Sequence, residues 1–301
     1  MNALLRSLLF VPGDSERKQI KAVASQADAL ILDLEDSVAA AQLPAARLRV
    51  RELLRARPRG QLWVRVHSLS SGLLLEDLSA VFPGEPAGLV LPKVNSAAEI
   101  IQIDRELAAL EARDGRPAGA TKLIVIATET AQAVLNLPAF APLLAAEPSA
   151  AARVVALTWG LEDLSAAIGA SGKLDAAGQL TFTLQLARSL CLLAASALGV
   201  QALDGVCVNF RDTGGLQREA ADARRDGFTG KLAIHPDQIE AINAAFSPTA
   251  VELARARRIV AAFAASPAAG VLNLEGEMID RPHLLQAQRL LNLAARSAPA
   301  D

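Results

Sequence analysis

The sequence contains few of the side chains on which several classes of protein depend. Only two cysteines, Cys191 and Cys207, occur in 301 residues, and both lie in apolar stretches. This usage argues against a disulfide framework or a zinc site and fits a reducing cytosol. No dense run of Lys and Arg is present, and 30 basic residues against 32 acidic ones give a net charge of -2. Because binding nucleic acid requires a basic face, we expect no nucleic-acid partner.

Long apolar runs are also missing, although the mean hydropathy is +0.29. Each apolar stretch is interrupted by charge, Pro or Gly before the ~18 to 20 residues that a membrane-spanning helix needs. The first residues, through Pro12, include Arg6 and lead to no small-residue cleavage site, unlike a signal peptide. With 52% hydrophobic and 21% charged residues, the chain is also too apolar to be disordered. We therefore expect a soluble cytoplasmic enzyme that does not bind membranes.

Several catalytic and cofactor-binding motifs are absent as well. The chain has no G-x-G-x-x-G fingerprint, no Walker A sequence and no G-x-S-x-G elbow. It therefore lacks the simplest motifs for binding a nucleotide cofactor and for catalysis by a nucleophilic serine. Histidine occurs three times. His67 and His283 are candidate general bases, although an isolated histidine is more often structural, and His235 next to Pro236 is expected to brace its loop.

What the chain does contain is a regular alternation of short apolar segments with helical patterns. Nearly continuous apolar runs are typical of parallel strands covered on both faces. The predicted strands are Leu8–Val11, Ala29–Leu34, Leu62–Val66, Gly88–Val94, Lys122–Thr128, Val154–Trp159, Gly205–Phe210 and Lys231–His235. Eight strand–helix repeats within roughly 250 residues favour a closed (β/α)8 TIM barrel over a doubly wound open sheet.

The pattern changes after the eighth repeat. We predict a catalytic barrel over residues 1–246 and a C-terminal helical extension over residues 247–301. The extension contains two helical patterns, Thr249–Ala264 and Pro282–Arg296, separated by a Gly- and Glu-rich segment. Because the barrel is complete before it, the extension is expected to cover the active site of its own chain or to reach that of a neighbouring subunit.

Charged side chains follow nearly every predicted strand. In a TIM barrel these points meet at the carboxyl-terminal mouth, where such enzymes place their chemistry. A single charge there can be a helix cap, as Asp36 or Asp212 would be, but seven charged strand ends are difficult to attribute to capping. The acidic residues at this mouth are Glu35, Asp36, Glu129, Glu162 and Asp163.

Carboxylates gathered in this way repel one another unless cations neutralise them. With few histidines and distant cysteines, a hard ion with oxygen ligands such as Mg²⁺ fits better than zinc. The alternative is an ion-pair network with Arg6, Arg65 and Lys93. The planar fork of Arg65 also suits a carboxylate or thioester oxygen, and the turn at Pro12-Gly13 leads into a helix whose free N–H groups can hold an anion.

Seven segments, spread in order over nearly the whole chain, resemble the citrate lyase β-subunit-like branch of the HpcH/HpaI aldolase superfamily. They are Arg6–Gly13, Asp28–Val38, Leu91–Lys93, Ala127–Thr130, Trp159–Leu164, Gly227–Pro236 and Gly276–Pro282. One departure is His67, at a position where family members commonly have Asn. The resemblance implies a magnesium-dependent carbon–carbon lyase that cleaves malyl-CoA, citramalyl-CoA or a citryl thioester on a carrier protein.

The resemblance also implies roles for individual residues. Glu129 and Asp163 would be the direct Mg²⁺ ligands, and the catalytic residues Glu35 and Asp36 would hold metal-bound water. Arg65 would bind the substrate at the metal.

Further residues are implied at the edges of the site. The other candidate substrate-binding residues are Arg6, Lys93, Pro12 and Gly13. Asp280 would be the acid/base, supplied by an adjacent subunit of a homotrimer or hexamer. Without the resemblance, Asp280 is better interpreted as the N-cap of the helix that contains Pro282.

Four other functions remain open on the sequence alone. The enolate chemistry also admits a thioesterase acting on malyl-CoA-type substrates, and the chain can equally be the β subunit of a citrate lyase complex. The third alternative is an aldolase that needs no CoA; the segment around Asp280 argues against it, because the thioester-cleaving branch carries that segment. The fourth is a catalytically silent assembly subunit; the intact acidic residues at the mouth count against it without excluding it.

Overall fold

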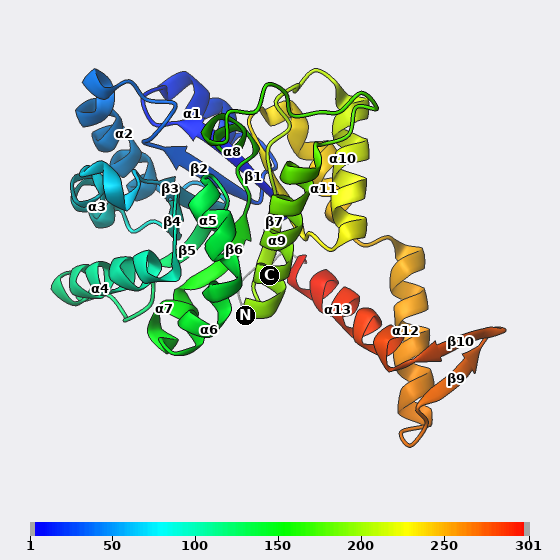
Figure 1. Ribbon diagram of the computed structural model, residues 1–301. Helices are drawn as coiled ribbons and strands as arrows, with labels where there is room; N and C mark the ends of the chain where they lie inside the picture. The colour runs from blue at the N-terminus through cyan, green and yellow to red at the C-terminus, as the bar shows by residue number, and fades with distance from the viewer. Residues whose placement is uncertain (1–3, 298–301) are drawn as a thin grey trace. The chain divides into compact units, whose positions relative to one another are not determined.

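The computed structural model describes residues 4–297, so residues 1–3 and 298–301 of the two predicted domains lie outside the described part. Eight parallel strands form a closed barrel in sequence order, with β8 paired to β1 (Figure 1). The strands are β1 (Ser7–Pro12), β2 (Ala29–Asp33), β3 (Gln61–Arg65), β4 (Gly88–Leu91), β5 (Lys122–Ile126), β6 (Val154–Thr158), β7 (Gln201–Asp204) and β8 (Gly230–Ala233). The predicted TIM barrel is confirmed.

Helices follow the strands of the barrel. They are α1 (Glu16–Val23), α2 (Leu43–Ala56), α3 (Leu74–Val81), α4 (Ala97–Arg113), α5 (Ala131–Asn136), α6 (Phe140–Ala145), α7 (Pro148–Arg153), α8 (Leu161–Ala167), α9 (Phe182–Leu198), α10 (Thr213–Asp226) and α11 (Ile239–Phe246). Short 3₁₀ turns are η1 (Ala40–Gln42), η2 (Leu69–Ser71), η3 (Phe82–Gly84), η4 (Leu137–Ala139) and η5 (Pro236–Gln238). Within residues 4–297, none of the helices is both long and apolar enough to cross a membrane.

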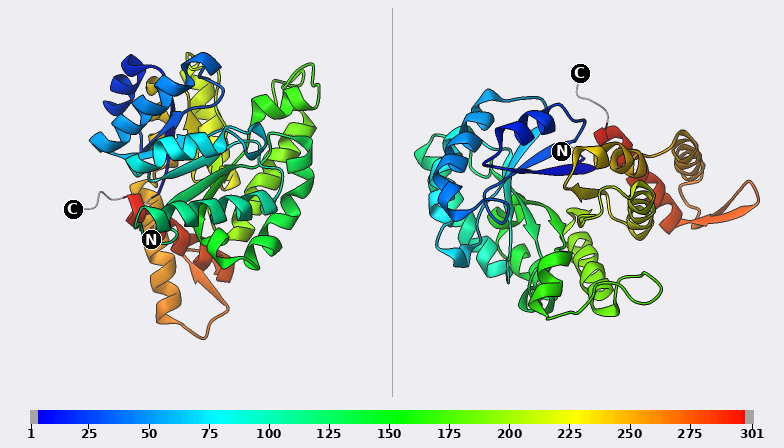
Figure 2. Two further views of the ribbon diagram at one scale, coloured as in Figure 1. Left: turned by 90° about the vertical axis from the view of Figure 1, so that its left-hand side faces the viewer. Right: turned by 90° about the horizontal axis from the view of Figure 1, so that it is seen from above.

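The barrel interior is filled by side chains that point inward from the strands. Figure 2 shows the strands inside a ring of helices. The buried interior cluster includes Leu8, Ile31, Trp63, Val90, Ile124, Leu203 and Leu232. Alternate residues of the same strands face outward and pack under the helices, which explains why the strands read as continuous apolar runs. This packing closes the interior and leaves the strand ends as the place for chemistry.

The seventh strand lies earlier than predicted. The sequence pattern placed it at Gly205–Phe210, but β7 spans Gln201–Asp204 and the predicted segment is a loop. Both ends of β7 are polar and yet buried: the Asp204 carboxylate accepts a hydrogen bond from Lys231 Nζ at 2.7 Å. A buried polar group is tolerated when it is paired, and this pairing is not visible in the sequence. As a consequence, Asp212 does not end a strand; it caps α10 by accepting from the Gly215 N–H at 2.8 Å.

The chain divides into two compact units, one of residues 5–245 and one that contains Leu4 and the residues from Phe246 onward. The second unit contains α12 (Ala250–Ala265), α13 (Arg281–Ser297) and an antiparallel hairpin of β9 (Val271–Leu274) and β10 (Glu277–Asp280). The sequence pattern predicted both helices but not the hairpin. Its two-residue turn, Glu275-Gly276, has positive φ at both positions (56° and 89°), as a type I′ hairpin turn requires. Ile259, Phe263 and Ile279 belong to the small core of this unit.

Candidate active site

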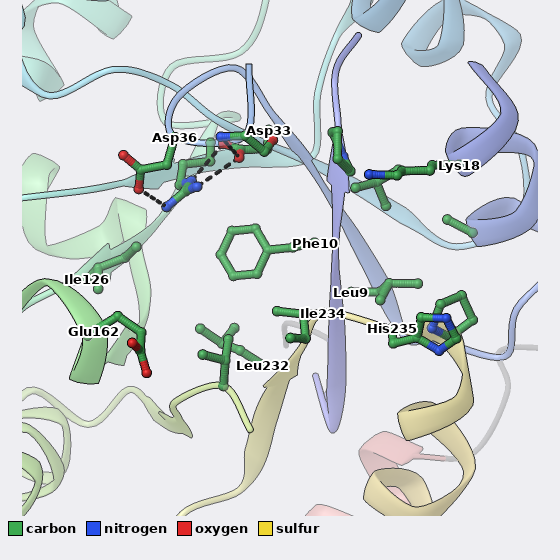
Figure 3. Close-up of a pocket in the computed structure, with 18 of the residues that line it drawn as sticks. Leu9, Phe10, Lys18, Asp33, Asp36, Ile126, Glu162, Leu232, Ile234 and His235 are labelled. Atoms are coloured by element: carbon green, nitrogen blue, oxygen red, sulfur yellow. Dashed lines mark hydrogen bonds and ion pairs between the residues drawn. The ribbon is translucent and has the colours of Figure 1, made fainter. Parts of the chain in front are cut away.

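A cavity of about 770 Å³ opens at the carboxyl ends of the barrel strands. Small-molecule sites typically have volumes of roughly 300–1,000 Å³. In the view of Figure 3, Phe10 lies in the middle, with Leu232 and Ile234 below it and Asp33 and Asp36 above it. The cavity therefore combines an apolar surface with a charged one. The charged residues that line it at the ends of β2, β3, β5 and β6 are Asp33, Asp36, Arg65, Glu129, Glu162 and Asp163.

Arg65, the last residue of β3, is a rigidly held cation of this cavity. Two parallel hydrogen bonds join its guanidinium to Asp33, from Nε to Oδ1 and from Nη2 to Oδ2, both at 2.7 Å. A third runs from Nη1 to Asp36 Oδ2 at 3.1 Å, and the guanidinium carbon lies 4.9 Å from the Phe10 ring centroid. Burial opposes the charge, but the hydrogen bonds and charge of Asp33 raise the pKa of Arg65 above its ordinary value. The group therefore stays charged and fixed in direction.

Asp33 was missed by the sequence analysis, which treated it as the interior of an apolar strand. Its side chain is buried, and in the sheet register it lies directly beside Arg65. Burial raises the pKa of Asp33, but the Arg65 guanidinium more than offsets this effect and keeps the pKa below its usual value. The same carboxylate accepts from the backbone N–H groups of Glu35 and Ser37 at 3.0 and 3.1 Å. Asp33 therefore orients both Arg65 and the acidic loop after β2. The sequence offered one signal for this pair: an Asp and an Arg stand near the ends of two consecutive predicted strands, where they can lie side by side.

Lys93 lies among the carboxylates of the mouth. Its Nζ is 2.6 Å from Glu35 Oε1, 3.2 Å from Asp36 Oδ1 and 3.7 Å from Asp163 Oδ1. These carboxylates raise the pKa of Lys93 well above its ordinary value, despite the opposing effect of burial. The backbone of Lys93 has a φ of 52°, in the left-handed region that a non-glycine residue adopts only at a cost of about 1 kcal/mol or more. This conformation directs its backbone N–H to Glu129 Oε2.

Glu129 is a buried carboxylate that lacks a cationic partner. Its residue is only 3% exposed, and no ion pair to it is found among the described residues. Burial, followed by the charges of Asp163 and Glu35, raises the pKa of Glu129 to about 8. A Cβ atom on Gly160 would lie 2.4 Å from Glu129 Cγ, so only glycine admits the side chain in this position. The ion-pair network that the sequence left open therefore exists around Arg65 and Lys93, but it does not neutralise Glu129.

Asp163, in the first turn of α8, lines the same cavity as Glu129 and has a side chain that is 34% exposed. Its charge helps to raise the pKa of Glu129, so the two carboxylates lie close enough to interact. Within residues 4–297, no group of three or more His, Cys, Asp or Glu side chains forms a complete ligand set for a metal. Two carboxylates that share a cavity can hold an ion that completes its shell with water or substrate oxygens, as Mg²⁺ commonly does.

The raised pKa of Glu129 predicts how the stability of the metal-free protein depends on pH. The folded state binds a proton at Glu129 with a pKa of about 8, whereas the unfolded chain releases it near 4.5, the ordinary pKa of a glutamate. This contribution is therefore complete below pH 4.5 and is lost as the pH rises towards 8, by on the order of a few kcal/mol. Thermal denaturation in chelator should show the melting temperature of the wild type falling relative to that of Glu129→Gln between pH 5 and 8.5. Parallel curves for the two proteins would contradict the assignment.

Three of the predicted substrate-binding residues, Arg6, Gly13 and Lys93, are not among the residues that line the cavity. Arg6 precedes β1, at the amino-terminal end of the barrel, and its Nη2 is 2.7 Å from Asp28 Oδ1. The expected substrate contact is therefore corrected to a structural ion pair. The Gly13 N–H donates to Asp33 O at 2.8 Å, and a Cβ there would lie 2.6 Å from that oxygen. Gly13 permits a close chain crossing and has no amide left for an anion, whereas Pro12 does line the cavity.

His67 has a structural contact instead of a place in the cavity lining. Its Nδ1 lies 2.7 Å from Asp77 Oδ2, and its backbone N–H donates to the same oxygen at 2.8 Å. Asp77 is fully buried in α3 and also binds Arg47 Nε at 2.8 Å. The histidine that replaces the family's common Asn at position 67 therefore makes a structural contact with α3 just after β3. It is not among the residues that line the cavity.

Three basic residues that the sequence pattern did not single out lie on α1 and line the cavity. They are Arg17, Lys18 and Lys21. Lys21 lies three residues after Lys18 and four after Arg17, so it is on the same side of the helix as both. The sequence indicated only that free N–H groups at this helix start can attract an anion, whereas the side chains of its first two turns carry full positive charges. They give the cavity a basic edge opposite the acidic residues of α8.

Asp280 lies in the second unit, as the last residue of β10. Its Oδ1 is 2.6 Å from His283 Nδ1, and the two side chains are 33% and 41% exposed. The role predicted for Asp280 is argued as a proposal below.

The sequence matches known proteins over almost its whole length. The model of the family described as HpcH/HpaI aldolase/citrate lyase matches residues 6–236. A human protein named citramalyl-CoA lyase, mitochondrial, is 36% identical over 296 residues, covering 96% of this chain and 85% of its own. A (3S)-malyl-CoA thioesterase of Cereibacter sphaeroides strain KD131 is 34% identical over 290 residues, covering 95% and 93%.

A solved structure shows the same fold. The crystal structure of the protein CitE from Mycobacterium tuberculosis in complex with magnesium, acetoacetate and coenzyme A has 35% sequence identity and a TM-score of 0.76. The similarity covers 98% of this chain and 100% of that one. The chain is an enzyme that belongs to the HpcH/HpaI aldolase/citrate lyase family.

Proposed function

We propose that the protein is a magnesium-dependent carbon–carbon lyase that cleaves a β-hydroxyacyl-CoA thioester of the malyl-CoA or citramalyl-CoA type. The observation that carries the proposal is Glu129, a buried carboxylate that has no ion pair within residues 4–297 and shares the cavity with Asp163. A buried anion of this kind is costly unless a cation binds it. Glu129 and Asp163 would hold the ion, in line with the magnesium named in the CitE complex.

The reaction requires three chemical events. A base removes the proton of the β-hydroxyl group, and the bond between the α- and β-carbons breaks. Its electron pair moves into the thioester as an enolate, while the former hydroxyl carbon becomes the ketone or aldehyde carbonyl of an α-keto acid. The enolate carbon then takes up a proton and gives an acetyl-type thioester. When bound, Mg²⁺ would supply Lewis-acid stabilisation of the substrate oxygens.

The residues around the proposed ion site have separate tasks. Arg65, locked by Asp33, presents the remaining donors of its guanidinium to a carboxylate or carbonyl oxygen of the substrate. Glu35 and Asp36 would hold water at the ion. This role is supported by Glu35 Oε2, a buried oxygen that lies 3.1 Å from Arg65 Nη1 and accepts no hydrogen bond among the described residues. Lys93 Nζ pairs with both carboxylates and holds them in place.

Proton transfer is assigned to Asp280. A carboxylate that exchanges protons with solvent and substrate must be accessible, and the Asp280 side chain is 33% exposed. We propose that it is supplied to the active site by an adjacent subunit of a homotrimer or hexamer. The subunit number and the cytoplasmic location remain predictions from the sequence, and the human relative is named mitochondrial.

The basic edge on α1 supports a CoA thioester over a simple ester. Arg17, Lys18 and Lys21 place three positive charges along one side of the cavity, and such charges attract the phosphate groups of coenzyme A. The apolar surface around Phe10 suits the chain that joins those phosphates to the reacting thioester.

Thioester hydrolysis is the second candidate function, because a relative of similar identity is named (3S)-malyl-CoA thioesterase. The β subunit of a citrate lyase complex is the third. A single assay separates them. The protein is incubated with Mg²⁺ and malyl-CoA, citramalyl-CoA, a citryl thioester and the N-acetylcysteamine analogues, which lack the phosphates, while α-keto acid and free thiol are measured separately.

The lyase predicts release of α-keto acid without free thiol, and a lower KM for CoA thioesters than for the N-acetylcysteamine analogues. Free thiol together with the intact hydroxy acid would identify a thioesterase. Turnover of the citryl thioester alone would favour a citrate lyase subunit. No turnover of any thioester, with Mg²⁺ present and the protein folded, would contradict the proposal and indicate a catalytically silent subunit.

A further inference from the structure

The carboxylate of Asp280 is held by a histidine one helical turn further along the chain. Asp280 ends β10 and directly precedes α13, in which His283 is the third residue. The distance from His283 Nδ1 to Asp280 Oδ1 is 2.6 Å, short for a hydrogen bond and in the range of charge-assisted contacts. Both residues belong to the same compact unit.

Asp280 occupies the N-cap position of α13 without acting as an N-cap. Among the described residues, no backbone N–H of α13 donates to its carboxylate, and the second residue of the helix is Pro282, which has no N–H. Other helices of this protein are capped by their side chains, as α5 is by Thr130 and α12 by Thr249. The direction of the Asp280 carboxylate is therefore determined by the His283 ring, whose Nδ1 faces both Oδ1, at 2.6 Å, and the backbone nitrogen of Asp280, at 3.2 Å.

The short contact needs one hydrogen atom between the two side chains. A carboxylate oxygen and an unprotonated ring nitrogen would repel each other at 2.6 Å, so either Nδ1 donates to Oδ1 or a protonated carboxyl group donates to Nδ1. The second oxygen, Oδ2, has no partner within residues 4–297. One oxygen of Asp280 is thus anchored, and the other is open to exchange a proton.

We propose that His283 is a positioning residue for Asp280: its Nδ1 fixes Oδ1 and thereby leaves Oδ2 as the oxygen that exchanges a proton with the substrate. This inference rests on the proposed function, in which Asp280 is the acid/base. A free aspartate would rotate between side-chain conformers, and only a fraction of them would present an oxygen at a productive angle. Anchoring Oδ1 removes that freedom before the substrate binds.

Two substitutions separate positioning from a merely structural role. In His283→Leu the ring nitrogen is lost, and kcat should fall ~10-fold or more with KM and the Mg²⁺ requirement unchanged, because a hydrogen bond to a charged group is removed. In His283→Asn the amide nitrogen replaces Nδ1 as a donor to Oδ1, so kcat should recover to within ~3-fold of the wild type. Leu285→Ala, at a position on the same helix that is 60% exposed, is the matched control and should keep the wild-type kcat.

The same assays include the wild type and Asp280→Asn, with thermal denaturation of every variant to confirm folding. An active wild type and an impaired Asp280→Asn, together with a normal kcat in His283→Leu, would overturn this inference alone. Equal losses in the Leu and Asn variants would also overturn it, since the anchoring hydrogen bond would then be irrelevant. A wild type that cleaves no thioester would overturn the proposed function and the inference together.

Discussion

Glu129→Gln is expected to lower lyase turnover by ~1,000-fold or more and to remove detectable Mg²⁺ binding. The substitution keeps the shape of the side chain and changes only its charge and one donor group. Glu129 is buried, and no ion pair to it is found among the described residues. A neutral amide would therefore serve as well as the carboxylate at this position, unless the negative charge is needed to hold a cation. Isothermal titration with Mg²⁺ and steady-state turnover of the preferred thioester are the measurements.

A matched control distinguishes ion binding from damage to the fold. Glu111 is also buried, but its carboxylate binds Arg153, with 2.7 Å between Glu111 Oε1 and Arg153 Nη1, and its pKa is lowered to about 2. Glu111→Gln should therefore lower the melting temperature and leave Mg²⁺ affinity unchanged. Glu129→Gln should instead abolish Mg²⁺ binding. In metal-free buffer at pH 8 it should also raise the melting temperature, because it removes an unfavourable buried charge. Undiminished Mg²⁺ binding in Glu129→Gln would exclude Glu129 as a ligand.

The barrel was predictable from the sequence because parallel strands covered on both faces need apolar residues at successive positions. Seven of the eight predicted strands coincide with the observed ones to within three residues at each end. The exception, β7, carries Gln201 and Asp204, whose burial depends on partners far away in the chain, such as Lys231. A local pattern contains no information about such partners. The β9–β10 hairpin was missed for a related reason: its strands have four residues each, too few for a clear alternation.

The acidic residues of the mouth were predictable because charges directly after buried strands have no structural use. What the sequence did not reveal is how these charges are paired. Asp33 was hidden inside an apolar run, and its role depends on the register that places it beside Arg65. Arg6 precedes the first strand, so its place at the amino-terminal end of the barrel follows from the sequence, but its ion pair with Asp28 does not.

Asp280→Asn is expected to lower kcat by ~100-fold or more, the typical contribution of a general acid or base. KM and Mg²⁺ affinity should not change, because Asn keeps the size of the side chain and Asp280 is assigned to proton transfer and not to binding the ion. Glu277→Gln is the matched control: it removes another carboxylate of the same hairpin, one paired with Arg255, and should keep full activity. Unchanged turnover in Asp280→Asn would remove this residue from the mechanism.

Mixing the two inactive variants tests whether Asp280 acts across a subunit boundary. A Glu129→Gln chain retains Asp280, and an Asp280→Asn chain retains Glu129. If the acid/base comes from a neighbouring subunit, co-expression produces some active sites in which both residues are native, and activity returns to a measurable fraction of that of the wild type. If each chain supplies its own Asp280, every site in the mixture carries one defect and the mixture stays inactive. Restored activity would therefore establish a shared active site, and with it an oligomer as the catalytic unit.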